Sequence, residues 1–190
     1  MNHFNVGTEG FATTSSGYTA FVTWDATNLY LGYTGPDVGI TNPSKWLLVY
    51  LDTRSGTSGM SVGTTLDTQH AAFPAGFTAD YELLYRLDGT LLVRKIIGGV
   101  WTTFAQWPPV LLDYNGSFLE LAIPFAMLDD APTVGVTALM VNEQAYSEWS
   151  YAGLYADSFT DGYYQAIPIA HDLLVDRSST LAPNAAQNEQ

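Results

Sequence analysis

Residues 81–97 have the sequence Tyr-Glu-Leu-Leu-Tyr-Arg-Leu-Asp-Gly-Thr-Leu-Leu-Val-Arg-Lys-Ile-Ile. Two runs rich in aliphatic and aromatic side chains flank the dipeptide Asp88-Gly89, which suits a type I′ turn between antiparallel strands. A second turn at Gly98-Gly99 leads into residues 100–104. The stretch therefore predicts a meander of three antiparallel strands.

Similar short runs, separated by Gly, Pro, Asn and Asp, occur along most of the chain, whereas helical periodicity is nearly absent. Such strands must each bury a face against a second sheet. We therefore expect an all-β protein, an antiparallel β-sandwich, with one domain over residues 1–177 and a linker or frayed tail over residues 178–190. Further strands are expected at residues 18–24, 28–33, 46–52, 118–124, 133–142 and 163–169, and a single helical turn at residues 124–128.

Composition excludes several classes of protein. The 190 residues carry 6 Lys and Arg against 19 Asp and Glu, a formal charge of −13, which argues against nucleic acid as a partner. The absence of cysteine excludes a thiol nucleophile and disulfides. The longest apolar run, residues 47–51, is far shorter than the roughly 20 residues that a membrane-spanning helix needs, so we expect no membrane insertion. Few lysines with many Thr, Tyr and Trp are typical of prokaryotic secreted proteins, so we expect an acidic extracellular or cell-surface domain, part of a larger protein.

Two stretches resemble a known family. Residues 21–33, Phe-Val-Thr-Trp-Asp-Ala-Thr-Asn-Leu-Tyr-Leu-Gly-Tyr, and residues 46–53, Trp-Leu-Leu-Val-Tyr-Leu-Asp-Thr, are similar to the opening of family 9 carbohydrate-binding modules and the wider DOMON-like superfamily. Residues 77–82, the pair Gly99 and Trp101, and residues 119–124 follow in the same order. The resemblance implies a jelly-roll-like sandwich that, in many relatives, is attached to secreted glycoside hydrolases and binds glucans or xylan. Other relatives bind haem, but the methionines and His70 of this chain form no recognisable axial pair.

Aromatic residues outside the core are the candidates for sugar binding. A flat ring stacks on the C–H face of a pyranose, and nearby amides or carboxylates bind its hydroxyls. We predict a loop over residues 142–157, with Trp149 as the stacking platform, and a second aromatic contact at Trp46, which follows another loop. In family 9 modules two tryptophans hold the sugar between them, and Trp46 and Trp149 have a similar order in the chain. The predicted ligand-binding residues are Trp149, Trp46, Tyr151, Tyr155, Gln144, Glu143 and Asn142.

Other kinds of site have weaker support in the sequence. We expect no cofactor, with Ca²⁺ as the alternative, held by Asp157 and Asp161 in an acidic loop. The carboxylates nearest to a glycosidase pair are Asp80, Glu82 and Glu120, but they lack a catalytic spacing, and no Gly-x-Ser-x-Gly motif is present. We therefore expect a protein that is not an enzyme.

The sequence thus predicts a non-catalytic module that binds a neutral carbohydrate of glucan or xylan type. The negative charge disfavours anionic polysaccharides. A polar face beside Tyr81 and Tyr85 is a further candidate surface. The alternative function is a structural or adhesive extracellular domain that contacts other protein chains through exposed aromatics, because aromatic side chains are enriched at protein interfaces as well.

Overall fold

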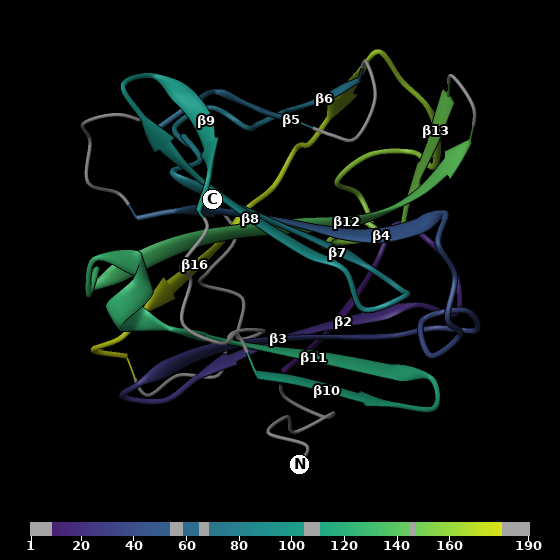
Figure 1. The fold of residues 1–190 in the computed structure, drawn as a ribbon, viewed down its shortest axis with the longest axis horizontal. Coiled ribbons are helices and arrows are strands. Elements are labelled where there is room, and N and C mark those ends of the chain that lie inside the picture. The colour runs from purple at the N-terminus through teal and green to yellow at the C-terminus, as the bar shows by residue number, and fades with distance from the viewer. Residues whose placement is uncertain (1–8, 54–58, 65–68, 105–110, 145–146, 180–190) are drawn as a thin grey trace.

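The computed structural model describes residues 9–53, 59–64, 69–104, 111–144 and 147–179. Within them, the strands form two large antiparallel sheets that pack face to face and a small third sheet (Figure 1). This arrangement confirms the predicted antiparallel β-sandwich. The only helical element among the described residues is the 3₁₀ turn η1, Phe125–Leu128, where a helical turn was expected.

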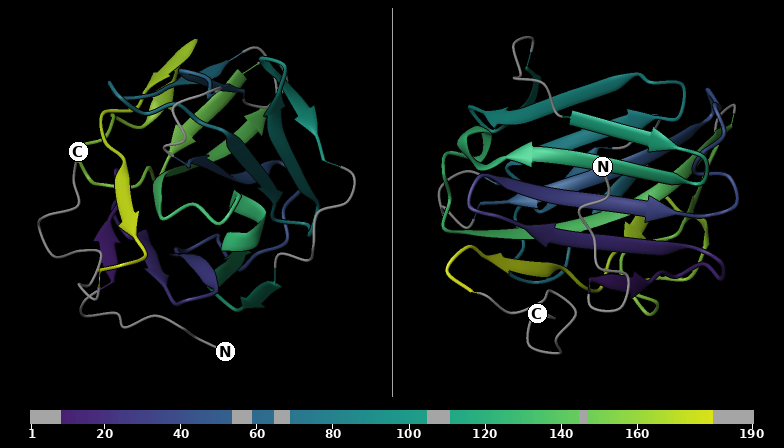
Figure 2. Two further views of the ribbon diagram at one scale, coloured as in Figure 1. Left: turned by 90° about the vertical axis from the view of Figure 1, so that its left-hand side faces the viewer. Right: turned by 90° about the horizontal axis from the view of Figure 1, so that it is seen from below.

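The lower sheet of Figure 1 has five strands in the order β1-β2-β3-β11-β10. Its strands lie side by side in the view from below (Figure 2, right). The hairpin of β2 and β3 turns where Asp25 accepts hydrogen bonds from the backbone N–H groups of Thr27 and Asn28. The bounds are β1 Gly10–Ala12, β2 Thr19–Trp24, β3 Asn28–Thr34, β10 Leu111–Asn115 and β11 Phe118–Pro124.

The upper sheet has eight strands in the order β14-β13-β12-β4-β7-β8-β9, and β16 pairs with the first part of β12. The predicted meander is present in it as β7, β8 and β9. Its centre is the pair β4 and β12, which are far apart in the chain. The bounds are β4 Lys45–Asp52, β7 Tyr81–Arg86, β8 Leu91–Ile97, β9 Val100–Thr103, β12 Thr133–Gln144, β13 Ser147–Tyr151, β14 Gly162–Tyr163 and β16 Leu173–Asp176.

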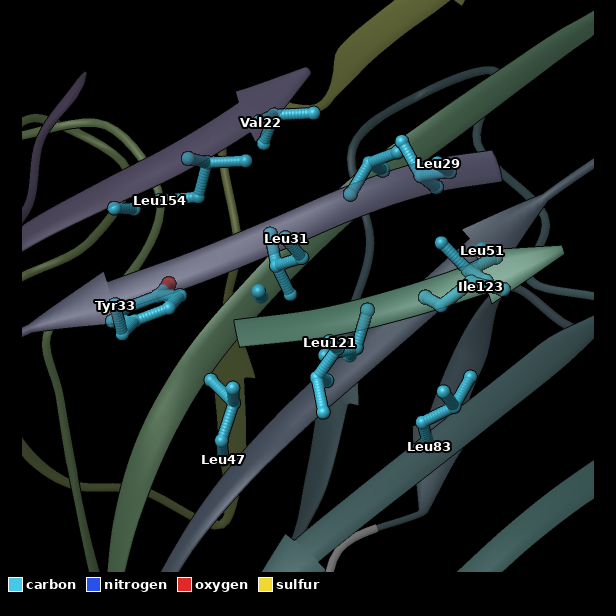
Figure 3. Packing of buried hydrophobic residues seen from close by; sticks show 14 of the residues in the cluster. Val22, Leu29, Leu31, Tyr33, Leu47, Leu51, Leu83, Leu121, Ile123 and Leu154 are labelled. Carbon is cyan, nitrogen blue, oxygen red and sulfur yellow. The ribbon is translucent and has the colours of Figure 1, made fainter. Parts of the chain in front are cut away.

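The main core fills the space between the two large sheets. Side chains alternate across each strand, so every second residue of the upper sheet faces the lower one. In Figure 3, Leu47 and Leu83 of the upper sheet lie close to Leu31 and Leu121 of the lower sheet, and all four are fully buried.

The other face of the upper sheet is also covered. Leu48 and Tyr50 of β4 point away from the main core, into a second hydrophobic cluster with Phe77 and Ile167. The small sheet contributes to this cover; it has the order β15-β6-β5, with a parallel pair between β15 and β6. Its bounds are β5 Val62–Thr64, β6 His70–Ala72 and β15 Ala166–Pro168. Burial on both faces explains the continuous apolar run of β4.

Two predicted segments differ from the structure. Residues 142–157 are not a loop throughout, because β12 continues to Gln144 and β13 follows from Ser147. Glu148 and Ser150 of β13 are buried, so polar residues face inward and the usual alternation was not recognisable. The single strand predicted over residues 163–169 is two strands, β14 and β15, in different sheets. Residues 180–190 of the predicted tail lie outside the described residues.

Candidate functional site

Four side chains form a row across four neighbouring strands at one end of the upper sheet. Lys45 of β4 pairs with Asn142 of β12, Asn142 with Trp149 of β13, and Trp149 with Tyr163 of β14. Residues directly opposite one another on paired strands project from the same face. With strands about 4.8 Å apart, the row spans about 14 Å. We call these four residues the aromatic row.

Trp149 and Tyr163 are the exposed members of the aromatic row. Trp149 is 37% exposed and Tyr163 is 54% exposed. Their ring centroids are 5.0 Å apart and the ring planes meet at 82°, an edge-to-face contact. Figure 1 shows β13 and the end of β12 bending away from the lower sheet. The row therefore presents an indole and a phenol to solvent at the end of the sandwich.

A polar cluster adjoins the aromatic row through Lys45. Asp37 forms an ion pair with Lys45 and accepts hydrogen bonds from the hydroxyls of Tyr18, at 2.8 Å, and Tyr151, at 3.3 Å. Tyr151 follows Trp149 by two residues on β13, so its side chain lies on the same face. The rings of Tyr18 and Tyr151 also pack edge to face, with centroids 5.5 Å apart. Tyr18, Asp37, Lys45 and Tyr151 are the polar cluster.

Electrostatics keeps both phenols of the polar cluster neutral. Burial, reinforced by the negative charge of Asp37, raises the pKa of Tyr18 and Tyr151 well above the ordinary value. Both hydroxyls therefore stay protonated and act as donors to the carboxylate. Since the charge of Lys45 offsets that of Asp37, the cluster offers polar groups with little net charge.

Two glycines allow the loop that carries Asp37 to pack closely. A Cβ atom at Gly35 would overlap the ring of Tyr18, and one at Gly39 would overlap the backbone carbonyl of Gly116 in the turn between β10 and β11. Only a residue without a side chain permits these approaches. The loop is therefore fixed against the lower sheet on both sides of Asp37.

Asp161 holds the segment that follows β13. Its carboxylate accepts hydrogen bonds from the hydroxyls of Thr14 and Ser15, each at 2.5 Å. Those hydroxyl oxygens in turn accept the backbone N–H groups of Gly153, at 2.9 Å, and Ala152, at 2.7 Å. Ala152 has a left-handed backbone with φ of 48°, which is unfavourable for a residue other than glycine. The network compensates for this strain and ties β13 to the start of the lower sheet.

The two predicted metal ligands, Asp157 and Asp161, contact different parts of the chain. Asp157 lies on the surface with its side chain 81% exposed, and its carboxylate is 3.3 Å from the imidazole of His171. Asp161 is engaged by hydroxyl groups, as described above. Among the described residues, no group of three or more His, Cys, Asp or Glu side chains is placed to hold a metal ion.

Trp46 does not face Trp149. Trp46 pairs with Val141, the residue next to Asn142, and therefore projects from the opposite face of the upper sheet. It is only 5% exposed, its indole N–H donates to Glu143 at 2.9 Å, and the guanidinium of Arg86 lies 5.2 Å from the centre of its ring. The structure thus does not place the two tryptophans on either side of one ligand.

The remaining predicted ligand residues have different positions. Asn142 belongs to the aromatic row, Tyr151 belongs to the polar cluster, and Glu143 is on the face of Trp46. Tyr155 is buried between Phe11 and His171, with ring centroids 5.2 and 5.9 Å away. The side chain of Gln144 lies outside the described residues.

The three carboxylates considered for catalysis are all buried. Asp80 accepts the backbone N–H and the hydroxyl of Thr53, at 2.9 and 2.6 Å. Glu82 is fully buried and pairs with Arg94 at 2.7 Å, so the face of β7 that was considered open to solvent is covered at this position. Glu120 is buried on β11 in the lower sheet.

Sequence reasoning missed Tyr163, Lys45 and Asp37. Tyr163 was assigned to a longer strand, and its neighbour across the strand pair is Trp149, a partner that only the register reveals. Asp37 lies in the loop that precedes Trp46, and Lys45 is the residue directly before Trp46. The signal that was present is the concentration of Gly, Pro, Asp and Asn over residues 34–45, which is typical of a structured loop rather than a strand.

No protein-family model, curated protein or solved structure matches the chain. Over the residues that the structure describes, no helix has the length and hydrophobicity needed to cross a membrane. Function therefore has to be argued from the aromatic row and the polar cluster.

Proposed function

We propose that the protein binds a neutral carbohydrate, of glucan or xylan type, at the aromatic row, without catalysing a reaction. The observation that carries the proposal is the pairing of two exposed aromatic rings, Trp149 and Tyr163, on adjacent strands beside hydrogen-bonding groups. Apolar rings cover the C–H faces of a sugar, and an amide such as Asn142 pairs with two adjacent hydroxyls. Rings held on paired strands lose little freedom on binding, which favours affinity.

The charge of the molecule supports a neutral ligand. The chain carries a formal charge of −13, which repels polyanions such as pectin or nucleic acid. At the site, the ammonium of Lys45 is engaged by Asp37. A ligand rich in hydroxyls fits these groups better than a carboxylated or sulfated one.

The setting that we propose is extracellular or at the cell surface of a prokaryote, within a larger protein. Its support is the composition, with no cysteine and few basic residues, and the similarity to family 9 modules and DOMON-like domains. We also propose that the protein is related to family 9 carbohydrate-binding modules and DOMON-like domains and shares their jelly-roll-like topology.

Affinity electrophoresis against soluble β-glucan and xylan tests the proposal. Wild type should be retarded, and Trp149→Ala should weaken binding by about tenfold, because stacking on one aromatic ring is worth about 1 to 3 kcal/mol. Phe104→Ala is the matched control, because Phe104 is an exposed ring away from the aromatic row. If wild type binds no neutral glycan, or if the two variants bind alike, the proposal fails.

A second candidate function, a structural or adhesive role in contacts between protein chains, is favoured by the opposite edge of the upper sheet. Strand β9 is the last of that sheet, with Val100 62% exposed, and Ile97 and Phe104 are exposed beside it. Residues 96–112 contain no charged side chain, although charges commonly protect edge strands from pairing with other chains. Sedimentation of wild type and Val100→Lys over a range of concentrations tests this role; association that the substitution abolishes would support it.

A further inference from the structure

We infer that the aromatic row takes a single carbohydrate chain or a short free oligosaccharide, rather than the flat surface of an ordered polysaccharide such as crystalline cellulose. The inference rests on the proposed function, because it specifies the physical form of the ligand at the same site. It is argued from the angle between two rings and from the polar groups beside them.

The angle between the exposed rings excludes a flat ligand that contacts both. An ordered polymer surface presents its sugars in one plane, so rings that bind it together must themselves lie in one plane. The planes of Trp149 and Tyr163 meet at 82°, with centroids 5.0 Å apart. The two rings therefore form a corner. A single carbohydrate chain exposes both the C–H face and the hydroxyl edge of each sugar. It can therefore contact both rings in the corner between Trp149 and Tyr163.

The order of the side chains along the aromatic row also suits a single carbohydrate chain. A ligand lying along the row passes, over about 14 Å, the phenol of Tyr163, the indole of Trp149, the amide of Asn142 and the ammonium of Lys45. The polar groups are all on one side of the rings, where they can bind the hydroxyl edge of a sugar. In a packed polymer those hydroxyls are already bonded to neighbouring chains, so this half of the row would go unused.

The polar cluster holds its end of the row in place. Lys45 is engaged by Asp37, which also accepts the hydroxyls of Tyr18 and Tyr151. Asp37 is positioned by the close packing of Gly39 on Gly116. These contacts lie within the chain itself and restrict the side chains at the polar end of the row, so little freedom is lost there when a ligand binds.

Two measurements on the intact chain test the inference. Affinity electrophoresis and calorimetry with soluble mixed-linkage β-glucan, xylan and their oligosaccharides measure binding to separate chains, and a pull-down with microcrystalline cellulose measures binding to a flat surface. The variants are Trp149→Ala and Tyr163→Ala, with Phe104→Ala as the control on a distant strand. Chemical denaturation of each variant shows that it is folded.

We expect soluble chains to bind, crystalline cellulose to retain no more protein than an unrelated acidic protein, and each row variant to bind soluble ligand about tenfold more weakly. Retention on crystalline cellulose equal to that on soluble chains, and lost in Trp149→Ala, would overturn the inference while the proposed function stands. Full binding by Tyr163→Ala with loss in Trp149→Ala would overturn the two-ring corner in the same way. Failure of wild type to bind any neutral glycan would instead overturn the proposed function itself.

Discussion

Trp46 and Trp149 project from opposite faces of the upper sheet. Trp46 pairs with Val141 and Trp149 pairs with Asn142, so adjacent residues of β12 separate the two indoles. Trp46 packs into the second hydrophobic cluster and donates a hydrogen bond to Glu143, whereas Trp149 is exposed beside Tyr163. One indole is buried within the fold, and the other is partly exposed to solvent.

Alanine substitution should separate these two roles. Trp46→Ala removes a buried aromatic side chain, so we expect the free energy of unfolding to fall by about 3 to 5 kcal/mol. Trp149 is 37% exposed, so Trp149→Ala removes less buried surface than Trp46→Ala, together with an edge-to-face contact with Tyr163 that is worth about 0.5 to 1.5 kcal/mol, and we expect a smaller loss. Urea denaturation followed by circular dichroism measures both. Similar losses in the two variants would contradict the assignment of Trp149 to the surface.

Replacing Gly39 should disturb both stability and binding. The added Cβ of Gly39→Ala would overlap the carbonyl of Gly116, so the loop must move, at a cost of about 1 to 3 kcal/mol. Asp37 is two residues away, so the polar cluster should move with it and glycan affinity should fall. Ile40→Ala, at an exposed neighbour in the same loop, should change stability by no more than about 0.5 kcal/mol. An unaltered Gly39→Ala variant would show that the loop is not held there.

The hydroxyl of Tyr33 should contribute nothing to stability. Tyr33 is fully buried in the main core on β3, and its hydroxyl has no hydrogen-bond partner among the described residues. Tyr33→Phe removes a buried polar atom, so we expect an unfolding free energy that is unchanged or about 1 kcal/mol higher. Tyr18→Phe is the matched comparison: it removes a hydrogen bond to the Asp37 carboxylate and should cost about 1.5 to 3 kcal/mol. Denaturation curves that rank the two variants in the reverse order would refute this account.

Stability should fall in alkaline solution. Burial raises the pKa of Tyr33 and Tyr50 above the ordinary value, which is about 10 in an unfolded chain. Above about pH 10 the unfolded chain therefore loses phenolic protons that the folded chain retains, and unfolding becomes more favourable. The stabilisation by neutral tyrosines is complete below about pH 10 and decreases as the pH rises further.

Urea denaturation at about pH 8 and about pH 11 tests this prediction, and absorbance of the phenolate follows the tyrosines directly. Tyr33→Phe should show a smaller decrease than wild type, because it has one buried phenol fewer. An unfolding free energy that stays constant between the two pH values would contradict it.

The strands predicted from sequence were those with strong local signals. Asp88-Gly89 between alternating runs is sufficient to specify β7 and β8, and the apolar run at residues 46–52 is sufficient for β4. β13 was missed because Glu148 and Ser150 face a second cluster, which exists only through the cover that the small sheet helps to provide. Burial of this kind depends on residues distant in the chain, so no local sequence pattern indicates it.

The candidate site was predictable only in part. Trp149 was recognised as exposed from its polar neighbours, although those neighbours are themselves buried. The pairing of Trp149 with Tyr163, and the separation of Trp46 from both, depend on strand register. A shift by one residue in register exchanges the two faces of a strand, so the composition of a site on a sheet cannot be read without it.

The pairing of β4 with β12 has a consequence during synthesis on the ribosome. β4 ends at Asp52 and β12 begins at Thr133, so the nascent chain carries a strand that is apolar over residues 46–51, with one open edge, until the residues of β12 have emerged. Such an edge invites association with other nascent chains. Chains whose translation stops before residue 133 should therefore need a chaperone to stay dispersed.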